Sequence, residues 1–247
     1  MRWVLGVVAF VSLVFAAVPS VADVTIWMSS STGSPAPHEM TMVVSIKGQK
    51  MRTDMKGPVY DFSSFVDAAT KQQFWVNHLR KEVQDFGAAV ASVSMNLGDA
   101  AVSIKPNGQT KDVLGRACVG YTFTVTLPET YQDEALTVAL SGVVWIAKEG
   151  PGVSEYREAQ RAITAGGLQT RPWARGREDQ VIADVVAAIS GNGIPMEQET
   201  RRRVTGSGPI AQVLGKATLK TVTKVTAISV DPIADDLFVV PANYTKR

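Results

Sequence analysis

Few side chains in this sequence are of the types that carry out catalysis. His38 and His78 are its two histidines, and Cys118 is its one cysteine. A nucleophilic site of the Ser-His-Asp or Cys-His kind needs a histidine beside a serine or beside that cysteine. The sequence has no Gly-x-Ser-x-Gly, His-Glu-x-x-His or Gly-rich phosphate-loop motif. We therefore predict a protein that is not an enzyme and has no bound cofactor.

Cys118 follows Ala117 and precedes Val119 at the start of a strongly apolar segment. This setting is typical of a buried, inert thiol rather than of a nucleophile. A single cysteine forms no internal disulfide and no metal-ligand pair. The chain must therefore be stabilised by burial, even in an oxidising compartment.

The methionines are the second candidate for chemistry. Five of the eight fall within a short span: Met28, Met40, Met42, Met51 and Met55. Strand alternation places Met40 and Met42 on one face, and Met51 and Met55 on a shared face of the next strand. Thioethers bind Cu(I), so a copper site with His38 is one hypothesis. An adaptable apolar lining is the other. We favour the lining and predict no metal site, because no dense Met-x-x-Met or Met/His tract is present.

The elements that would position these residues are mostly strands. In residues 121–127, Tyr, Phe, Val and Leu alternate with three threonines, as in a half-buried strand. Similar patterns predict the strands 40–46, 51–55, 61–68, 73–79, 81–86, 101–105, 136–147, 195–205 and 217–230. Asn107-Gly108 predicts a turn between 101–105 and the strand through Cys118. Residues 29–37 read as a polar loop, and Gly206-Ser207-Gly208 as a hairpin turn.

Two helices interrupt the series of strands. Ser154 and Glu155 begin a predicted helix over 154–165, which the pair Gly166-Gly167 ends. The second covers 178–189 and carries one apolar stripe, listed here: Val181, Ile182, Val185, Val186 and Ile189. Residues 168–176 form a loop between the two, and 88–96 are a third candidate helix. The order is thus strand, helix, helix, strand within an antiparallel series.

The N-terminal segment has the features of an export signal. Arg2 precedes a short apolar run over 3–18, and Ser20-Val21-Ala22 forms a cleavage site. A membrane anchor is the alternative, but a spanning helix needs about 20 apolar residues. We predict cleavage after Ala22, a periplasmic or secreted protein with no membrane span, and one domain over 23–247. With a net charge of +2, the chain has no electrostatic footprint for nucleic acid.

Several local phrases resemble secreted bacterial proteins of unassigned function in the LolA-like superfamily, which includes periplasmic lipoprotein carriers and LppX-type lipoproteins. The phrases are KMRTDM at 50–55, FVD at 65–67, LGRACVGY at 114–121, VWIA at 144–147, GIPM at 193–196 and LFVVPANY at 237–244. The resemblance implies a strongly curved antiparallel sheet, an incomplete barrel, with helices over its concave side. It also implies a cavity that holds an acyl chain or lipid, and it brings no catalytic motif.

Pattern and resemblance together predict a mainly β (α+β) protein that binds a lipophilic ligand without catalysis. The alternative function is copper binding through the methionine-rich strand pair. A twisted sheet leaves a concave face against which the helix over 178–189 must bury its stripe. The residues that we expect to line the cavity are Met40, Met42, Trp145, Val181, Val185 and Ile189.

Overall fold

We describe the protein from a computed structural model, which covers residues 22–33, 38–87, 100–168, 177–216 and 218–247. The strands are β1 (Val24–Thr32), β2 (His38–Lys47), β3 (Lys50–Lys56), β4 (Asp61–Asp67), β5 (Gln72–Asn77), β6 (Glu82–Asp85), β7 (Ala101–Val113), β8 (Arg116–Tyr131), β9 (Glu134–Ala147), β10 (Ile194–Thr205), β11 (Leu219–Ser229) and β12 (Thr245–Lys246). The helices are α1 (Val153–Ala165), α2 (Arg177–Ser190), α3 (Pro209–Leu214) and the short 3-10 helix η2 (Asp235–Phe238).

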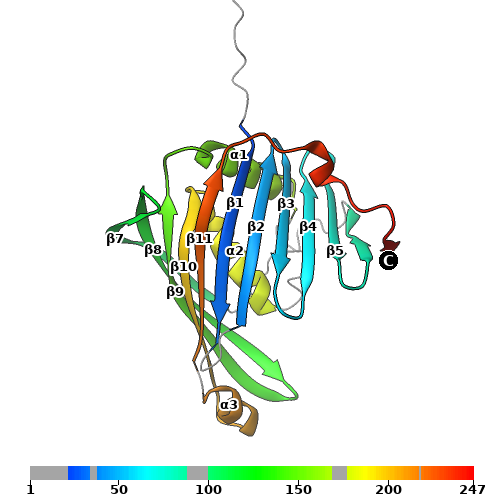
Figure 1. Cartoon of the computed structure of the whole chain (residues 1–247). Helices are drawn as coiled ribbons and strands as arrows, with labels where there is room; N and C mark the ends of the chain where they lie inside the picture. The colour runs from blue at the N-terminus through cyan, green and yellow to red at the C-terminus, as the bar shows by residue number, and fades with distance from the viewer. Residues whose placement is uncertain (1–21, 34–37, 88–99, 169–176, 217) are drawn as a thin grey trace, which may run out of the picture.

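All twelve strands belong to one sheet, in the order β12-β6-β5-β4-β3-β2-β1-β11-β10-β9-β8-β7. Neighbouring strands are antiparallel, except that β12 runs parallel to β6. The sheet is broad and curved, and it ends at β7 on one side and at β12 on the other (Figure 1). The predicted incomplete barrel is therefore confirmed.

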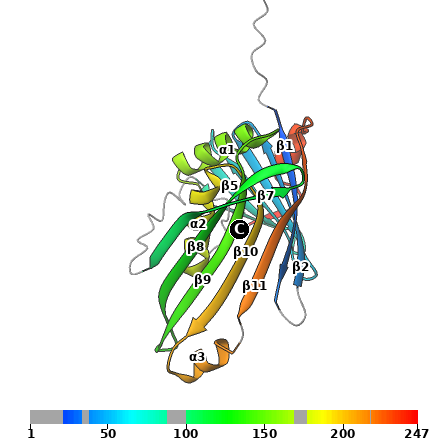
Figure 2. The ribbon, with the colours of Figure 1, turned by 90° about the vertical axis from the view of Figure 1, so that its left-hand side faces the viewer.

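The helices α1 and α2 lie on the concave side of this sheet (Figure 2). They connect β9 to β10, which are neighbours in the sheet, so the predicted strand-helix-helix-strand insertion is confirmed. The stripe Val181, Val185 and Ile189 of α2 is at most 2% exposed and packs in a core with inward side chains of β8 and β9. A second core lies under α1, where Tyr156 and Ile163 meet strands from the N-terminal half.

The polar loop expected over residues 29–37 is wrong in its first part. Ser29 to Thr32 belong to β1, a central strand that pairs with β2 and β11. The Ser30 hydroxyl lies 2.9 Å from that of Thr223, and the Thr32 hydroxyl 2.9 Å from that of Thr221. A polar run is stable in mid-sheet because its hydroxyls have partners on the next strand.

The turn expected at Asn107-Gly108 is also wrong. These residues form an irregularity inside the single long strand β7, whose register with β8 shifts between Pro106 and Thr110. The chain reverses at Leu114 and Gly115, which have φ values of 54° and 72°. Two successive left-handed residues suit a tight hairpin between twisted strands, and this geometry sets the turn position.

A short helix replaces the simple hairpin expected at residues 206–208. After β10 the chain forms α3, which has Pro209 in its first turn. The Glu134 carboxylate accepts hydrogen bonds from the N–H groups of Ile210 (2.9 Å) and Ala211 (2.8 Å). This contact satisfies free donors at the start of α3, and it comes from a strand more than seventy residues earlier in the chain.

Other sequence predictions fall partly outside the described residues. These include the signal segment up to Val21, the candidate helix over 88–96 and the first residue of the strand over 217–230. None of the helices in the described part of the chain has the length and apolar character that a membrane crossing requires.

Candidate functional site

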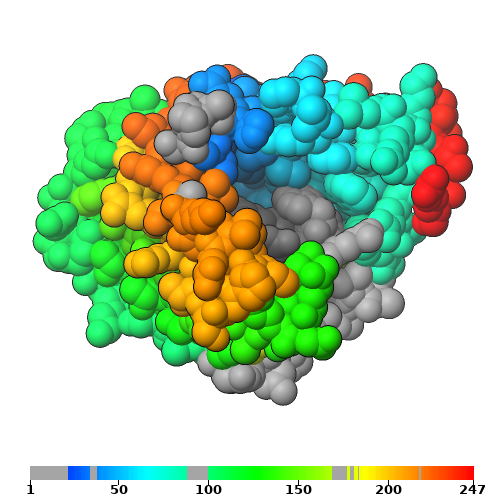
Figure 3. All heavy atoms as spheres, turned by 90° about the horizontal axis from the view of Figure 1, so that it is seen from below, coloured from blue at the N-terminus to red at the C-terminus, as the bar shows by residue number. Residues whose placement is uncertain are grey.

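A cavity of about 500 Å³ lies between the concave face of the sheet and the two helices. Figure 3 shows the molecule from the end at which α3 lies, where the surface is hollowed between α3 and the N-terminal strands. The lining side chains are Met28, Ser30, Met40, Met42, Val44, Met51, Thr53, Met55, Tyr60, Phe62, Trp75, Tyr156, Gln160, Ile182, Val186, Ala187, Ser190, Pro195, Gln198, Thr200, Thr221 and Thr223.

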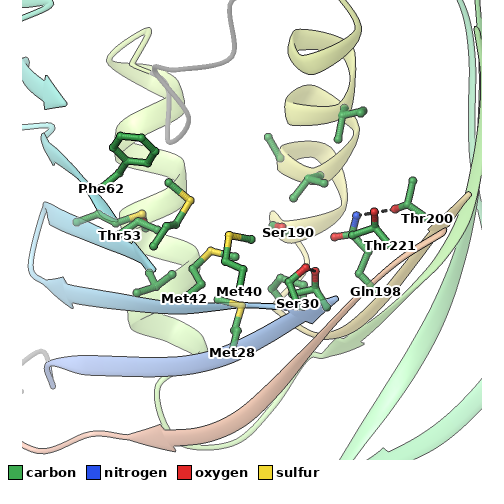
Figure 4. A pocket seen from close by; sticks show the side chains of 18 of the residues that line it. Met28, Ser30, Met40, Met42, Thr53, Phe62, Ser190, Gln198, Thr200 and Thr221 are labelled. Carbon is green, nitrogen blue, oxygen red and sulfur yellow. Dashed lines mark hydrogen bonds between the residues drawn. The ribbon is translucent and has the colours of Figure 1, made fainter. Parts of the chain in front are cut away.

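One wall of the cavity is built of thioethers. Register places Met42 of β2 opposite Met28 of β1 on one side and opposite Met55 of β3 on the other. Side chains of residues paired across strands share a face, so the three methionines form a row. Phe62 of β4 is opposite Met55 and continues the row. Figure 4 shows Met28, Met40 and Met42 directed into the same space.

The adjoining wall, formed by β1, β11 and β10, is polar but uncharged. The Ser30 and Thr223 hydroxyls are 2.9 Å apart, and the Gln198 amide donates to the Thr200 hydroxyl at 3.0 Å (Figure 4). Register places Thr221 opposite Thr200 on the next strand. These side chains form a strip of hydroxyl and amide groups beside the apolar surface.

The helices cover the cavity from the other side. Ile182, Val186 and Ser190 of α2 recur every four residues and face it, together with Ala187. From α1, Gln160 reaches the wall, where its amide lies 3.9 Å from the Met51 sulfur. The helix α2 is therefore apolar on two adjoining sides, one toward the sheet and one toward the cavity.

The structure places the six predicted site residues in three settings. Met40 and Met42 lie on the cavity wall. Val181, Val185 and Ile189 lie on the side of α2 that packs against β8 and β9. Trp145 is partly buried beside the core, and the Lys111 ammonium lies 5.6 Å from its ring centroid.

Sequence reasoning missed the polar wall and the aromatic end of the cavity. Thr221 and Thr223 of β11 alternate with other side chains, as does Thr200 on β10, whereas Ser29 to Thr32 of β1 form a continuous polar run. That alternation was the available signal. Alternation predicts a polar face on a strand, but it does not show that the polar faces of several strands surround one cavity. Tyr60, just before β4, and Trp75 of β5 also line the cavity, although β4 and β5 are several strands away from β10 and β11 in the sheet.

Two polar atoms on the cavity walls lack a hydrogen-bond partner within the described structure. They are the Ser190 hydroxyl and the indole N–H of Trp75, and both atoms are buried. Buried polar groups are nearly always paired in folded proteins. Both atoms therefore have hydrogen-bonding capacity that no described residue uses.

A second polar cluster lies on the outer face of the sheet, under the C-terminal segment. The Ser63 hydroxyl lies 2.6 Å from Nε2 of His78 and also bonds the Asp54 carboxylate. The other ring nitrogen of His78 is 3.1 Å from the Tyr244 hydroxyl. In a nucleophilic triad the carboxylate orients the histidine, whereas here it contacts the serine. Ser63 is fully buried, so the cluster ties the C-terminal segment to the sheet.

The described residues hold no group of three or more His, Cys, Asp or Glu side chains placed to bind a metal ion. His38 is exposed at the start of β2, and Cys118 is fully buried in the core. The cavity is therefore the candidate binding site in the described part of the chain.

Comparison with known proteins gives structural likeness alone. No family model matches the chain, and no curated protein matches it. The chain is similar to PNGF-II at 11% identity and a TM-score of 0.38, covering 91% of this chain and 31% of that one, so it spans about a third of PNGF-II. It is also similar to a LolA superfamily protein from Nitrosomonas europaea, at 8% identity and a TM-score of 0.31, over 90% of this chain and 91% of that one.

A third similar structure is a DUF1329 family protein from Desulfovibrio piger, at 9% identity and a TM-score of 0.33, covering 88% of this chain and 90% of that one. All three are likenesses of structure at identities of 8% to 11%.

Proposed function

We propose that this protein is a secreted or periplasmic, non-enzymatic binding protein that carries or senses a lipophilic ligand in the cavity. The observation that supports the proposal is a cavity of about 500 Å³ with a row of methionines on one wall and α2 on the other. This volume is in the range of ligand sites, which are mostly apolar with a few polar groups.

Apolar side chains that face an unfilled space lose contacts that a ligand would restore. Met28, Met40 and Met42 are only partly buried, although they lie on the inner face of the sheet. Methionine suits a site of this kind, because its flexible thioether adapts to chains of differing shape. The expected export signal at residues 1–22 supports a location outside the cytoplasm.

Filling the cavity tests the proposal. Ala187 of α2 lines the cavity and is exposed to it, so an Ala187→Trp side chain would occupy the binding space without displacing a core residue. Ala188, the next residue, is also exposed but does not line the cavity. Ala188→Trp is therefore a matched control with the same added side chain on the same helix.

The measurement is the fluorescence of Nile red, an uncharged polarity-sensitive dye, titrated with mature protein. We expect saturable binding that Ala187→Trp weakens at least about tenfold, or about 1.4 kcal/mol, and that Ala188→Trp leaves unchanged. Native mass spectrometry of protein from its own host should show added mass from a retained lipid. An absence of dye binding, or equal loss in both variants, would contradict the proposal.

A further inference from the structure

The polar wall of the cavity limits which head groups a ligand can have. Resting on the proposed function, we infer that the preferred ligand is an uncharged amphiphile. Its apolar chain lies along the methionine wall, and a neutral hydroxyl, ester or amide group bonds the Ser/Thr/Gln strip. Chains that end in an ionised carboxylate or phosphate are disfavoured.

The first observation is the chemistry of the lining. Its polar members are hydroxyl, amide, phenol and indole groups, and none of the described lining residues is Lys, Arg, His, Asp or Glu. Hydroxyl and amide groups both donate and accept hydrogen bonds, so they satisfy an alcohol or an ester. An ionised head in this space would lose its hydration without gaining an opposite charge, which is costly.

Arg202, the charged side chain that follows the polar strip along β10, already has a partner. Arg202 lies two positions after Thr200 on β10, so its side chain is on the same inner face of the sheet. Its guanidinium binds Glu178 of α2 through two contacts, Nε to Oε1 at 2.6 Å and a terminal nitrogen to Oε2 at 3.0 Å. A bidentate pair of this kind neutralises the cation, so Arg202 offers little attraction for an anionic head group.

The second observation is a buried hydroxyl for which the described structure has no partner. The Ser190 hydroxyl belongs to a side chain that is 2% exposed and lines the cavity. Ser190 lies at the end of α2, and Ser30 lies on the strip below it (Figure 4). A neutral polar atom held between helix and sheet would satisfy Ser190, for which no described residue is a partner.

The cavity therefore has a polar end and an aromatic end. The strip supplies Ser30, Thr223, Gln198, Thr200 and Thr221 from three adjacent strands. Phe62 and Trp75 lie toward the other end of the sheet, on β4 and β5, beyond the methionines. This separation orients the ligand, with its polar end at β10–β11 and its chain running toward β4–β5.

The test compares ligands that share one chain and differ in head group. Dodecanol, methyl dodecanoate and dodecanoate are each titrated against bound Nile red at pH 8, where dodecanoate is ionised. We expect the alcohol and the ester to bind at least about tenfold more tightly than dodecanoate, because only the anion lacks a counter-charge.

Variants then locate the head group. Thr223→Val keeps the shape of the side chain and removes its hydroxyl, so dodecanol binding should weaken about three- to tenfold more than Nile red binding, and the measured quantity is the ratio of the two affinities. Thr226→Val is the control, because Thr226 is exposed on the outer face of the same strand. Should Thr223→Val disturb folding through Ser30, Thr200→Val makes the same test on β10.

The outcomes separate the two proposals. Equal or tighter binding of dodecanoate would overturn the inference about the head group and leave the carrier function intact. The same is true if Thr223→Val and Thr200→Val do not change dodecanol binding relative to Nile red binding. If none of the ligands binds and Nile red gives no signal, both the carrier function and the inference fail.

Discussion

At the scale of residues, the methionines show how strand register turns composition into a surface. Met28, Met42 and Met55 are far from periodic in the sequence, yet they are direct neighbours across β1, β2 and β3. A row of thioethers is compatible with a soft metal as well as with an apolar ligand. The partners in the described structure favour the ligand, because Met51 contacts the Gln160 amide and His38 lies outside the lining.

We predict that the methionine row binds no copper. A Cu(I) titration of mature protein, with a competing chelator as the readout, should show no stoichiometric high-affinity site. The Met40→Leu/Met42→Leu variant should behave identically and should keep Nile red binding within about threefold, because leucine conserves the apolar volume. A tight one-to-one copper site that the variant loses would favour the metal-binding alternative.

The buried thiol of Cys118 makes the stability of the protein depend on pH. Its side chain is fully buried, and its thiol lies 3.4 Å from the Arg116 carbonyl oxygen, to which it donates. Burial, with a further contribution from the Asp112 carboxylate, raises the pKa of the Cys118 thiol above its ordinary value of 9.0. The folded state therefore keeps its proton at a pH at which the unfolded chain has lost it.

This difference in proton affinity makes the folded state less stable at high pH. The contribution of Cys118 to stability is fully present below pH 9.0 and is lost as pH rises above it, because ionisation then favours the unfolded chain. We expect the urea midpoint of the natural protein to fall more between pH 8 and pH 10 than that of Cys118→Ala. Identical pH profiles, or rapid labelling of the native thiol by iodoacetamide at pH 8, would contradict this prediction.

At the scale of elements, α2 serves two surfaces at once. Val181, Val185 and Ile189 close the core against β8 and β9, while Ile182 and Val186 face the cavity. Both sets follow helical spacing and differ by about 100° around the helix axis. The predicted stripe was therefore broader than one contact surface, and its two halves have different roles.

We predict that the core half of the stripe stabilises the fold. Val185 is 2% exposed, so Val185→Asp buries an unpaired charge and should cost at least about 3 kcal/mol of unfolding free energy. Ala188→Asp, on the exposed side of α2, should cost less than about 1 kcal/mol. Urea unfolding followed by circular dichroism measures both, and equal stabilities would show that α2 does not pack against the sheet.

At the scale of the whole molecule, the start of β1 is tied to the C-terminal segment. An Asp23 carboxylate oxygen accepts a hydrogen bond from the Ile233 N–H at 2.7 Å. The Lys47 ammonium lies 3.9 Å from the same oxygen and donates to the Ile233 carbonyl at 2.7 Å. Farther along, β12 pairs with β6, so the end of the chain reaches the sheet edge opposite β7.

We predict that the exported protein begins at Asp23. The short apolar run and the Ser20-Val21-Ala22 site favour cleavage after Ala22, which leaves the structured Asp23 intact. N-terminal sequencing of protein recovered from the periplasm or the medium measures this directly. Recovery of the uncleaved segment in a membrane fraction would contradict the prediction.

The sequence by itself determined the local pattern of the fold. Alternation identified most strands, and the stripe over 178–189 identified α2, because period 2 and period 3.6 are properties of neighbouring residues. It failed where a distant partner decides the structure. Ser29 to Thr32 form a strand only because Thr221 and Thr223 of β11 lie beside them, and α3 begins where Glu134 caps it.

Only the tertiary structure decided which residues line the cavity. Sequence reasoning selected Met40 and Met42, and it treated Val185 and Val186 as one stripe, although one faces the core and the other the cavity. The polar wall joins β1, β11 and β10, whose residues are about 190 positions apart in the Ser30–Thr223 pair. Curvature of the sheet brings such strands around one space, and curvature is a property of how strands pack rather than of any single strand.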